Sequence, residues 1–336
     1  MRKISGILAA AALVASIALV APAANAAGET ITGSGSSFMN SFQQTCSAAY
    51  TTDKVTYTST GSSTGKTQFA AGTTQFGGSD SLYSSDAPAN FVYVPLVGGP
   101  VGVVYNVKGV KSLKLTPKVI SDIFQGNITK WNDSKIKSLN PTAKLPSAAI
   151  QVVYRSDGSG TTNNFGNYMK QVAKGTWKAA DAWADALGKT PVGTSARTNQ
   201  GVIATVGTLA NSITYADTAD AKAAGLPFAS VQNGLGEFLQ PTVANAARFM
   251  AKQNLSSAGE VVFDYNVKVK GGYPITLVAY GLAPTKSPFT AKAAAVKDYF
   301  TYLIETCGPQ KAAAGNYVAM TGAVQKKALE LIARIK

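Results

Sequence analysis

The chain has 336 residues, of which 14% are charged and 46% hydrophobic, so a disordered protein is excluded and two ordinary domains are possible. It has no histidine, which removes most metal sites and every imidazole-dependent triad, and we expect no metal and no cofactor. A net charge of +14 favours anionic ligands or surfaces, but no basic run with interleaved aromatics occurs, so nucleic acid is not expected as a partner.

Residues 1–26 have the pattern of a signal peptide. A basic pair precedes a short apolar run over 7–20, and Ala24-Asn25-Ala26 is an A-x-A cleavage site. The mature chain is therefore expected to start at Ala27 with a net charge of +12. No cysteine follows the cleavage site, so we expect an exported, soluble protein without a lipid anchor, either periplasmic or extracellular.

The first strand–turn–helix pattern follows at once. Residues 29–32 predict a short strand, and Gly33-Ser34-Gly35-Ser36-Ser37-Phe38 is a glycine-rich turn before a helix. We expect Ser36 or Ser37 to cap that helix. The free N–H groups of its first turn would then form an anion-binding site.

The chain contains two cysteines, Cys46 and Cys307. Phe38, Phe42 and Cys46 have the i, i+4, i+8 spacing of one helix face, so Cys46 is expected to point into the core. An even cysteine count in an exported protein suggests a disulfide, but two buried free thiols fit the sequence equally well.

A second Ser/Gly turn, over residues 59–67, follows a strand predicted at 54–58. It resembles a Walker A loop, but only three residues separate Gly61 from Gly65 where that motif has four. A Ser/Gly turn at a helix start is the better interpretation, with the helix ending by Gln75. Lys66 either adds charge near a ligand or points to solvent, and we expect the latter.

Asp80 follows a short strand over 76–79. A carboxylate near anion sites is useful when the ligand carries a proton, because it accepts a hydrogen bond from P–OH and repels a fully deprotonated oxyanion. The alternative is an ordinary turn or helix-capping aspartate.

The third such pattern contains the most polar groups. Residues 149–153 predict a buried strand, residues 154–162 a glycine-rich turn, and residues 163–169 a helix. Arg155 adds a planar cation to the hydroxyl groups of the turn. A helix N-cap with turn glycines is the simpler alternative.

The rest of the chain also alternates between strands and helices. We expect strands at 92–97 and 101–105, broken by Gly98-Gly99-Pro100, and at 212–216 and 273–278. Helices are expected from Pro117 through Phe124, over 170–190, over 202–209 after a polar loop at 193–201, after Ser287-Pro288, and over 324–335. The fold class is therefore α/β, with its Ser/Gly turns at the carboxyl ends of strands, where ligands bind.

Four segments together resemble the phosphate-binding proteins of the high-affinity ABC phosphate importer, over nearly the whole mature chain. They are Gly33–Phe38, Gly61–Gly65, Phe76–Asp80 and Arg155–Thr161, in this order. The resemblance implies a two-lobe periplasmic-binding-protein-like fold of type II with two chain crossovers. Lobe I would comprise 27–97 and 276–336, and lobe II would comprise 98–275.

The resemblance also implies roles for individual residues. Asp80 would accept the proton of the bound phosphate, and Asp157 would hold Arg155 in position. The implied phosphate-binding residues are Ser37, Phe38, Ser62, Asp80, Arg155, Ser159, Gly160 and Thr161.

The implied function is capture of inorganic phosphate and delivery to the membrane permease of an ABC importer, by a monomer that is not an enzyme. Three alternatives remain open. The ligand could be sulfate, molybdate or phosphonate; the protein could be a surface phosphate scavenger without a transporter; or it could be a phosphatase, which the absence of histidine argues against.

Overall fold

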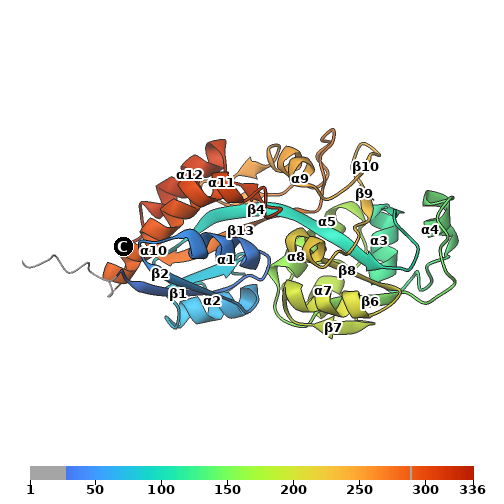
Figure 1. Ribbon diagram of the computed structural model, residues 1–336, viewed down its shortest axis with the longest axis horizontal. Helices are drawn as coiled ribbons and strands as arrows, with labels where there is room; N and C mark the ends of the chain where they lie inside the picture. Colours follow the sequence, from blue (N-terminus) through green and yellow to red (C-terminus); the bar gives the residue numbers. More distant parts are fainter. Residues whose placement is uncertain (1–27, 288–289) are drawn as a thin grey trace, which may run out of the picture.

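The computed structural model describes residues 28–287 and 290–336, so the signal peptide expected at 1–26 lies outside the described residues. One sheet runs through the whole molecule (Figure 1), in the order β2 (Lys54–Ser59), β1 (Thr30–Gly35), β3 (Phe76–Ser79), β13 (Thr276–Pro284), β4 (Phe91–Asn106), β8 (Ser212–Asp217), β6 (Gln151–Arg155) and β7 (Thr194–Ala196). Strand β14 (Val318–Ala319) also pairs with β4. Within 28–287 and 290–336, no helix is long and apolar enough to cross a membrane.

Strand directions explain how the molecule brings distant loops together. Strands β1, β2 and β3 are parallel to one another, and so are β6, β7 and β8. The antiparallel pair β13–β4 separates the two groups, and β4 runs with β3 but against β8. The carboxyl ends of both groups therefore point toward the middle of the molecule, where an α/β sheet binds its ligand.

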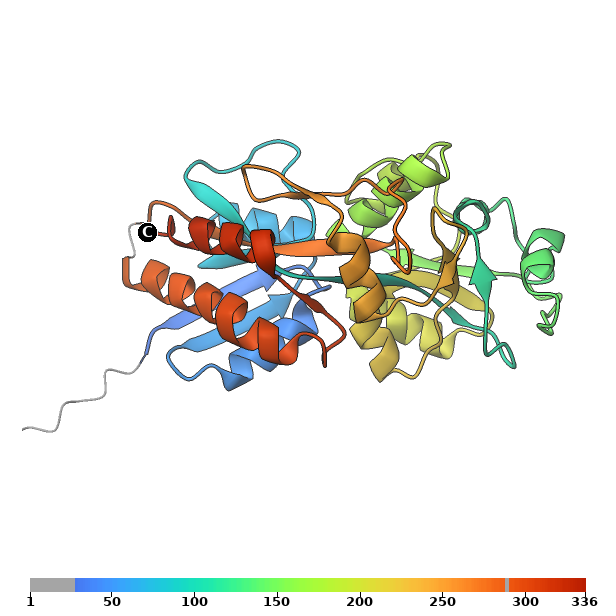
Figure 2. The same ribbon diagram turned by 90° about the horizontal axis from the view of Figure 1, so that it is seen from above.

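We call the part around β1–β3 the first half and the part around β6–β8 the second half. In the first half, α1 (Asn40–Ala49) and α2 (Ser62–Ala70) cover opposite faces of the sheet (Figures 1 and 2). The C-terminal helices complete this half: α10 (Thr290–Tyr302), the π-helical turn η1 (Leu303–Cys307), α11 (Gly308–Lys311) and α12 (Gly322–Ile332).

The second half carries the helices between β4 and β9. They are α3 (Pro117–Phe124), α4 (Ser134–Leu139), α5 (Gly160–Val172), α6 (Trp183–Leu187), α7 (Thr198–Thr208) and α8 (Thr218–Ala223). Small elements that the sequence did not predict are β5 (Lys114–Leu115), β9 (Ser230–Gln232), β10 (Phe238–Leu239), α9 (Val243–Met250), β11 (Asn254–Leu255) and β12 (Val261–Val262).

The break predicted at Gly98-Gly99-Pro100 is wrong, because β4 is one strand of 16 residues. The glycines make room for neighbouring side chains and do not end the strand. A Cβ atom on Gly98 would lie 2.4 Å from the Met250 side chain, and one on Gly99 would lie 3.1 Å from the Phe38 ring. Pro100 lies where pairing with β13 ends and pairing with β8 begins, so its missing N–H interrupts neither ladder.

Two predicted helices have different bounds. The helix expected over 170–190 is wrong, since α5 ends at Val172 and only α6 follows within that range. Lys174 and Gly175 have φ values of +60° and +91°, which a helix cannot contain. The polar loop expected at 193–201 contains β7 and the start of α7, which begins at Thr198. The helix over Pro117–Phe124 is confirmed, and β8 confirms the strand expected at 212–216.

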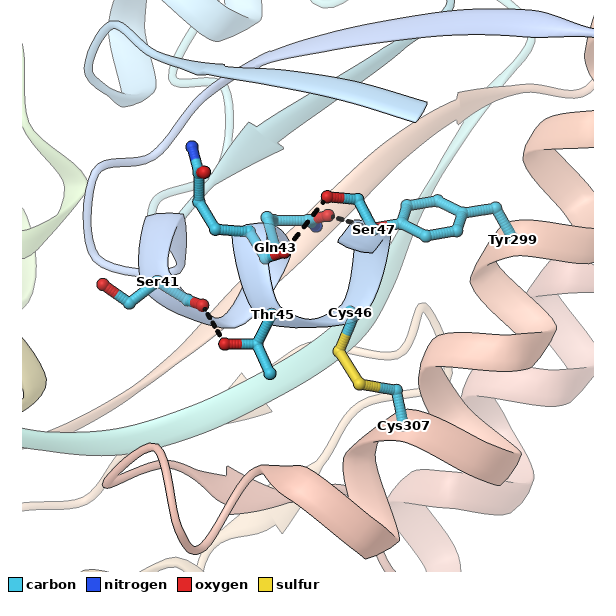
Figure 3. The surroundings of a disulfide bond; sticks show 8 residues. Ser41, Gln43, Thr45, Cys46, Ser47, Tyr299 and Cys307 are labelled. Atoms are coloured by element: carbon cyan, nitrogen blue, oxygen red, sulfur yellow. Dashed lines mark hydrogen bonds between the residues drawn. A yellow bond between two sulfur atoms is a disulfide. The ribbon is translucent and has the colours of Figure 1, made fainter. Parts of the chain in front are cut away.

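Cys46 and Cys307 form a disulfide (Figure 3), which selects one of the two alternatives left by the sequence. Their Cα atoms are 5.8 Å apart although 261 positions separate them in the chain. Beside the disulfide, the Tyr299 hydroxyl donates to Oε1 of Gln43 at 2.7 Å. The bond joins α1 to η1 and therefore lies entirely within the first half.

Candidate functional site

The predicted site residues come together where the carboxyl ends of the two strand groups meet. Ser37 and Phe38 follow β1, Ser62 begins α2 after β2, and Asp80 follows β3. The second half adds the end of β6 and the start of α5. All the predicted side chains are buried: Ser37, Phe38, Ser62, Asp80, Arg155, Asp157, Ser159 and Thr161 are each at most 6% exposed.

Asp80 is the acceptor at the centre of this arrangement. The Ser36 hydroxyl donates to its Oδ1, and the Thr161 hydroxyl donates to its Oδ2 at 3.0 Å. The Asp80 backbone N–H donates to Oγ of Ser62 at 3.2 Å. Burial raises the pKa of Asp80 to about 6, although the hydroxyls of Ser36 and Thr161 and the charge of Arg155 lower it.

Arg155 is held in one orientation by Asp157. Its Nε and Nη2 donate to the two carboxylate oxygens, the former at 2.7 Å. Burial alone would raise the pKa of Asp157, but the Arg155 guanidinium holds it below its usual value. The remaining Nη1 is buried and has no hydrogen-bond partner among the described residues. A buried cationic donor without an acceptor is costly unless an anion occupies the position in front of it.

The backbone at Thr198 is strained, and this conformation helps to fix the Asp157 carboxylate that holds Arg155. Thr198 has a φ of +63°, which is rare for a β-branched residue, and its N–H donates to Oδ1 of Asp157 at 3.0 Å. Gly61, with a φ of +93°, lies so close that a Cβ atom there would be 2.2 Å from Oδ2 of Asp157. Asp157 therefore contacts both halves tightly.

Asn199 belongs to the site and was not predicted. Its backbone N–H and its Nδ2 donate to Oγ of Ser37 at 2.9 and 3.1 Å, and Nδ2 also donates to Oγ1 of Thr161 at 3.3 Å. Ser37 belongs to the first half and Asn199 to the second. Asn199 lies in the first turn of α7, directly after β7, within the stretch 193–201 that was expected to be one polar loop. The same strand-then-helix pattern that marks the other site segments was the signal for this residue.

The helix cap predicted at Ser36 or Ser37 is wrong. Helix α1 begins at Asn40, and Met39 at its N-cap position makes no side-chain cap hydrogen bond. Instead, Oγ of Ser36 accepts a hydrogen bond from the Phe38 N–H at 3.1 Å, and the same hydroxyl donates to Asp80. The hydroxyl is thus used to position the carboxylate, a role that local sequence cannot reveal because the partner is 44 residues away.

The expectation that Lys66 points to solvent is also wrong. Lys66 is 8% exposed and its Nζ lies 2.9 Å from Oδ2 of Asp181, on the other half of the molecule. The contact could not be anticipated because the carboxylate is 115 residues away in the chain.

The face of the site near α1 has its own contacts between the halves. The Tyr317 hydroxyl donates to Oδ2 of Asp217 at 2.9 Å, and the Ser41 hydroxyl donates to Oδ1 of Asp220 at 3.2 Å. Burial raises the pKa of Asp217 well above its usual value and that of Asp220 to about 6. The two halves are therefore closed onto each other on both faces of the site.

The fold and this site define the class of the protein. A PBP superfamily domain model matches residues 20–306. The structure of a high-affinity periplasmic phosphate-binding protein bound with phosphate, PfluDING, has a TM-score of 0.74 at 20% identity, covering 88% of this chain and 92% of that one. A phosphate-binding protein from Stenotrophomonas maltophilia has a TM-score of 0.68 at 20% identity, covering 90% and 93%. The chain thus has the periplasmic-binding-protein-like fold.

Curated relatives give the family. Phosphate-binding protein PstS 3 of Mycobacterium tuberculosis is 34% identical over 296 residues, covering 83% of this chain and 76% of the relative. Phosphate-binding protein PstS of Pasteurella multocida is 36% identical over 283 residues, covering 82% and 81%. The chain belongs to the PstS family of phosphate-binding proteins.

Proposed function

We propose that the chain binds one inorganic phosphate between its two halves and that Nη1 of Arg155 donates to it. The observation that carries this proposal is the buried guanidinium, fixed by Asp157, whose third nitrogen has no partner among the described residues. Phosphate would accept from this nitrogen and from the hydroxyl and N–H groups around it. The proposed binding residues are Ser37, Phe38, Ser62, Asp80, Arg155, Ser159, Gly160 and Thr161.

Asp80 supplies selectivity in this proposal. A phosphate that keeps a proton can donate to the carboxylate, whereas sulfate cannot and would face an unpaired buried charge. Sites that leave buried polar groups unpaired with the wrong ligand discriminate by about 10⁴–10⁵. Sulfate, molybdate or phosphonate as the main ligand is the competing possibility.

We infer two lobes, lobe I with residues 27–97 and 276–336 and lobe II with residues 98–275, joined by chain crossovers at β4 and just before β13. Strand β4 runs from one half into the other, and β13 begins at the boundary, where Thr276 pairs with Pro100, so a bend at this point would open the site. Captured phosphate would be delivered by an exported monomer to the permease of an ABC importer. The protein would bind and release its ligand without chemical change.

The test is calorimetry on residues 27–336, stripped of ligand and titrated first with phosphate and then with sulfate. Tight one-to-one binding of phosphate with no response to sulfate is expected. Binding of both anions would keep the anion site but assign a broader ligand class. Binding of neither would refute the proposed function and leave only the fold.

A further inference from the structure

A second ionic contact joins the two halves beside the proposed phosphate site. Nζ of Lys66, on α2, lies 2.9 Å from Oδ2 of Asp181, which precedes α6. The two side chains are only 11% and 16% exposed. An ion pair between largely buried side chains differs from a pair on the solvated surface, which contributes little to stability.

The polar groups of this pair have further partners. The hydroxyls of Ser63 and Ser81 donate to Oδ2 of Asp181 at 2.8 and 3.0 Å, and Nδ2 of Asn163 donates to Oδ1 at 3.0 Å. Lys66 also donates to the Leu82 carbonyl at 3.0 Å. Burial alone would raise the pKa of Asp181, but Lys66 and the serine hydroxyls hold it below its usual value.

The same segments hold proposed phosphate-binding residues. Ser63 follows Ser62, and its N–H donates to the Gly158 carbonyl of the other half at 3.1 Å. The Ser159 N–H donates to the Asp181 carbonyl at 2.9 Å. Lys66 and Asp181 can therefore meet only when the ends of α2 and α5 have come together around the site.

We propose that Lys66 and Asp181 form a latch that stabilises the closed, phosphate-bound state and slows phosphate release without touching the anion. The proposal rests on the proposed phosphate binding. Opening would separate the pair and expose both ions to water. A change in one partner leaves the other ion buried without its counter-ion in the closed state alone, so it would shift the equilibrium between the closed and open states toward opening.

The experiment is a double-mutant cycle with Lys66→Met, Asp181→Asn and the double variant, each tested for phosphate affinity and for phosphate release by stopped flow. Each single change is expected to speed release by about tenfold or more, which corresponds to about 1.4 kcal/mol. The double variant is expected to release phosphate no faster than the faster single variant, because the two residues act on one contact. Lys66→Arg keeps the charge and is expected to remain close to the parent.

Lys327→Met is the matched control, because Lys327 pairs with Glu330 within α12 and does not join the halves. Thermal unfolding of the ligand-free variants provides the second readout. Parent-like release rates in both single variants, or a lowered ligand-free unfolding midpoint without faster release, would overturn the latch. A parent chain that binds no phosphate would overturn the proposed function on which the latch rests.

Discussion

The Thr161 hydroxyl donates to Oδ2 of Asp80 at 3.0 Å, and these two residues come from opposite halves of the molecule. Ser36, from the same half as Asp80, donates to Oδ1. Closure therefore completes the surroundings of the carboxylate as well as enclosing the ligand. The group that would distinguish phosphate from sulfate is fully positioned only in the closed state.

Asp80→Asn is expected to weaken discrimination against sulfate, with sulfate binding at least about tenfold tighter than in the parent. The amide removes the buried negative charge that sulfate would face and can itself donate to an oxyanion. Calorimetric titration with sulfate measures the change. Asp86→Asn is the control, because Asp86 is exposed. Sulfate rejection equal to that of the parent would show that Asp80 is not the discriminating group.

Sulfate binding by the parent is expected to strengthen as the pH falls from 7.5 to 5. The pKa of Asp80 is raised to about 6, so the carboxyl gains a proton in this range and stops repelling sulfate. Asp220 has a pKa of about 6 as well, so Asp80→Asn is needed as the reference and should lose most of the pH dependence. An unchanged pH profile in that variant would assign the effect to another group.

In the closed conformation that buries Asp80, the protein should also become less stable as the pH rises from about 4 through 6, and Asp217 and Asp220, whose pKa values are raised by burial as well, add to this trend. The pKa of Asp80 in the folded state lies above its ordinary value of 3.8, so the folded state binds the proton more tightly than the unfolded chain does. Urea unfolding at pH 4.5 and 7 would measure the difference. The difference in the free energy of unfolding between the two pH values should be smaller in Asp80→Asn. An equal difference would contradict the assignment to Asp80.

Arg155→Lys is expected to lower phosphate affinity about 10- to 100-fold. Lysine keeps the charge, but its three N–H groups share one nitrogen on a flexible stem and cannot reproduce the planar fork that pairs with both oxygens of Asp157 and directs Nη1 at the anion. Arg248→Lys, at an exposed arginine, is the control. Affinity that survives Arg155→Lys would place the anion elsewhere.

Gly160→Ala is expected to weaken phosphate binding about tenfold or more while leaving the ligand-free protein stable. A Cβ atom at this position would lie 2.7 Å from Oγ of Ser62 and 2.8 Å from the Asp80 carbonyl carbon, so it would hold the halves apart. Gly207→Ala in α7, where a Cβ atom meets nothing within 4 Å, is the matched control. Tight binding by Gly160→Ala would mean that phosphate is held without full closure.

Replacing both cysteines by alanine is expected to lower the free energy of unfolding by about 2–5 kcal/mol, since the bond closes a very long loop. Phosphate affinity should change little, because both cysteines lie in the first half. Denaturant unfolding and calorimetry on the same variant separate the two effects. A large loss of affinity would show that the disulfide also positions the site.

The sequence was most informative where one continuous segment contained a strand, a glycine-rich turn and the start of a helix. The strand-to-turn-to-helix segments were recognisable because their glycines, hydroxyls and apolar runs are neighbours in the chain. The structure places Ser62, Asp80 and Arg155 together, as their positions at strand ends predicted. The short elements β5 and β9–β12 were missed because they have too few residues to show a period.

Other features depended on partners far away in the chain. Lys66 and Ser36 were misjudged because Asp181 and Asp80 decide their roles, and no local spacing reveals those contacts. Gly98 and Gly99 were interpreted as a break between two strands because the side chains that require them, Met250 and Phe38, come from separate segments. The residue types therefore showed which groups could donate, accept or carry charge. Which partner each group contacts depends on tertiary packing.

The late position of β13 in the chain affects the order in which the two halves can fold. Strands β1, β2 and β3 are made early, but β3 pairs with β13, and α10 packs on β1 and β13. The second half is built largely from one uninterrupted stretch of chain. We therefore expect the second half to fold first, because the first half cannot be completed until the segment from β13 to the C-terminus has been made. A chain that stops before β13 would expose the edge of β3 and would be a target for proteolysis and aggregation.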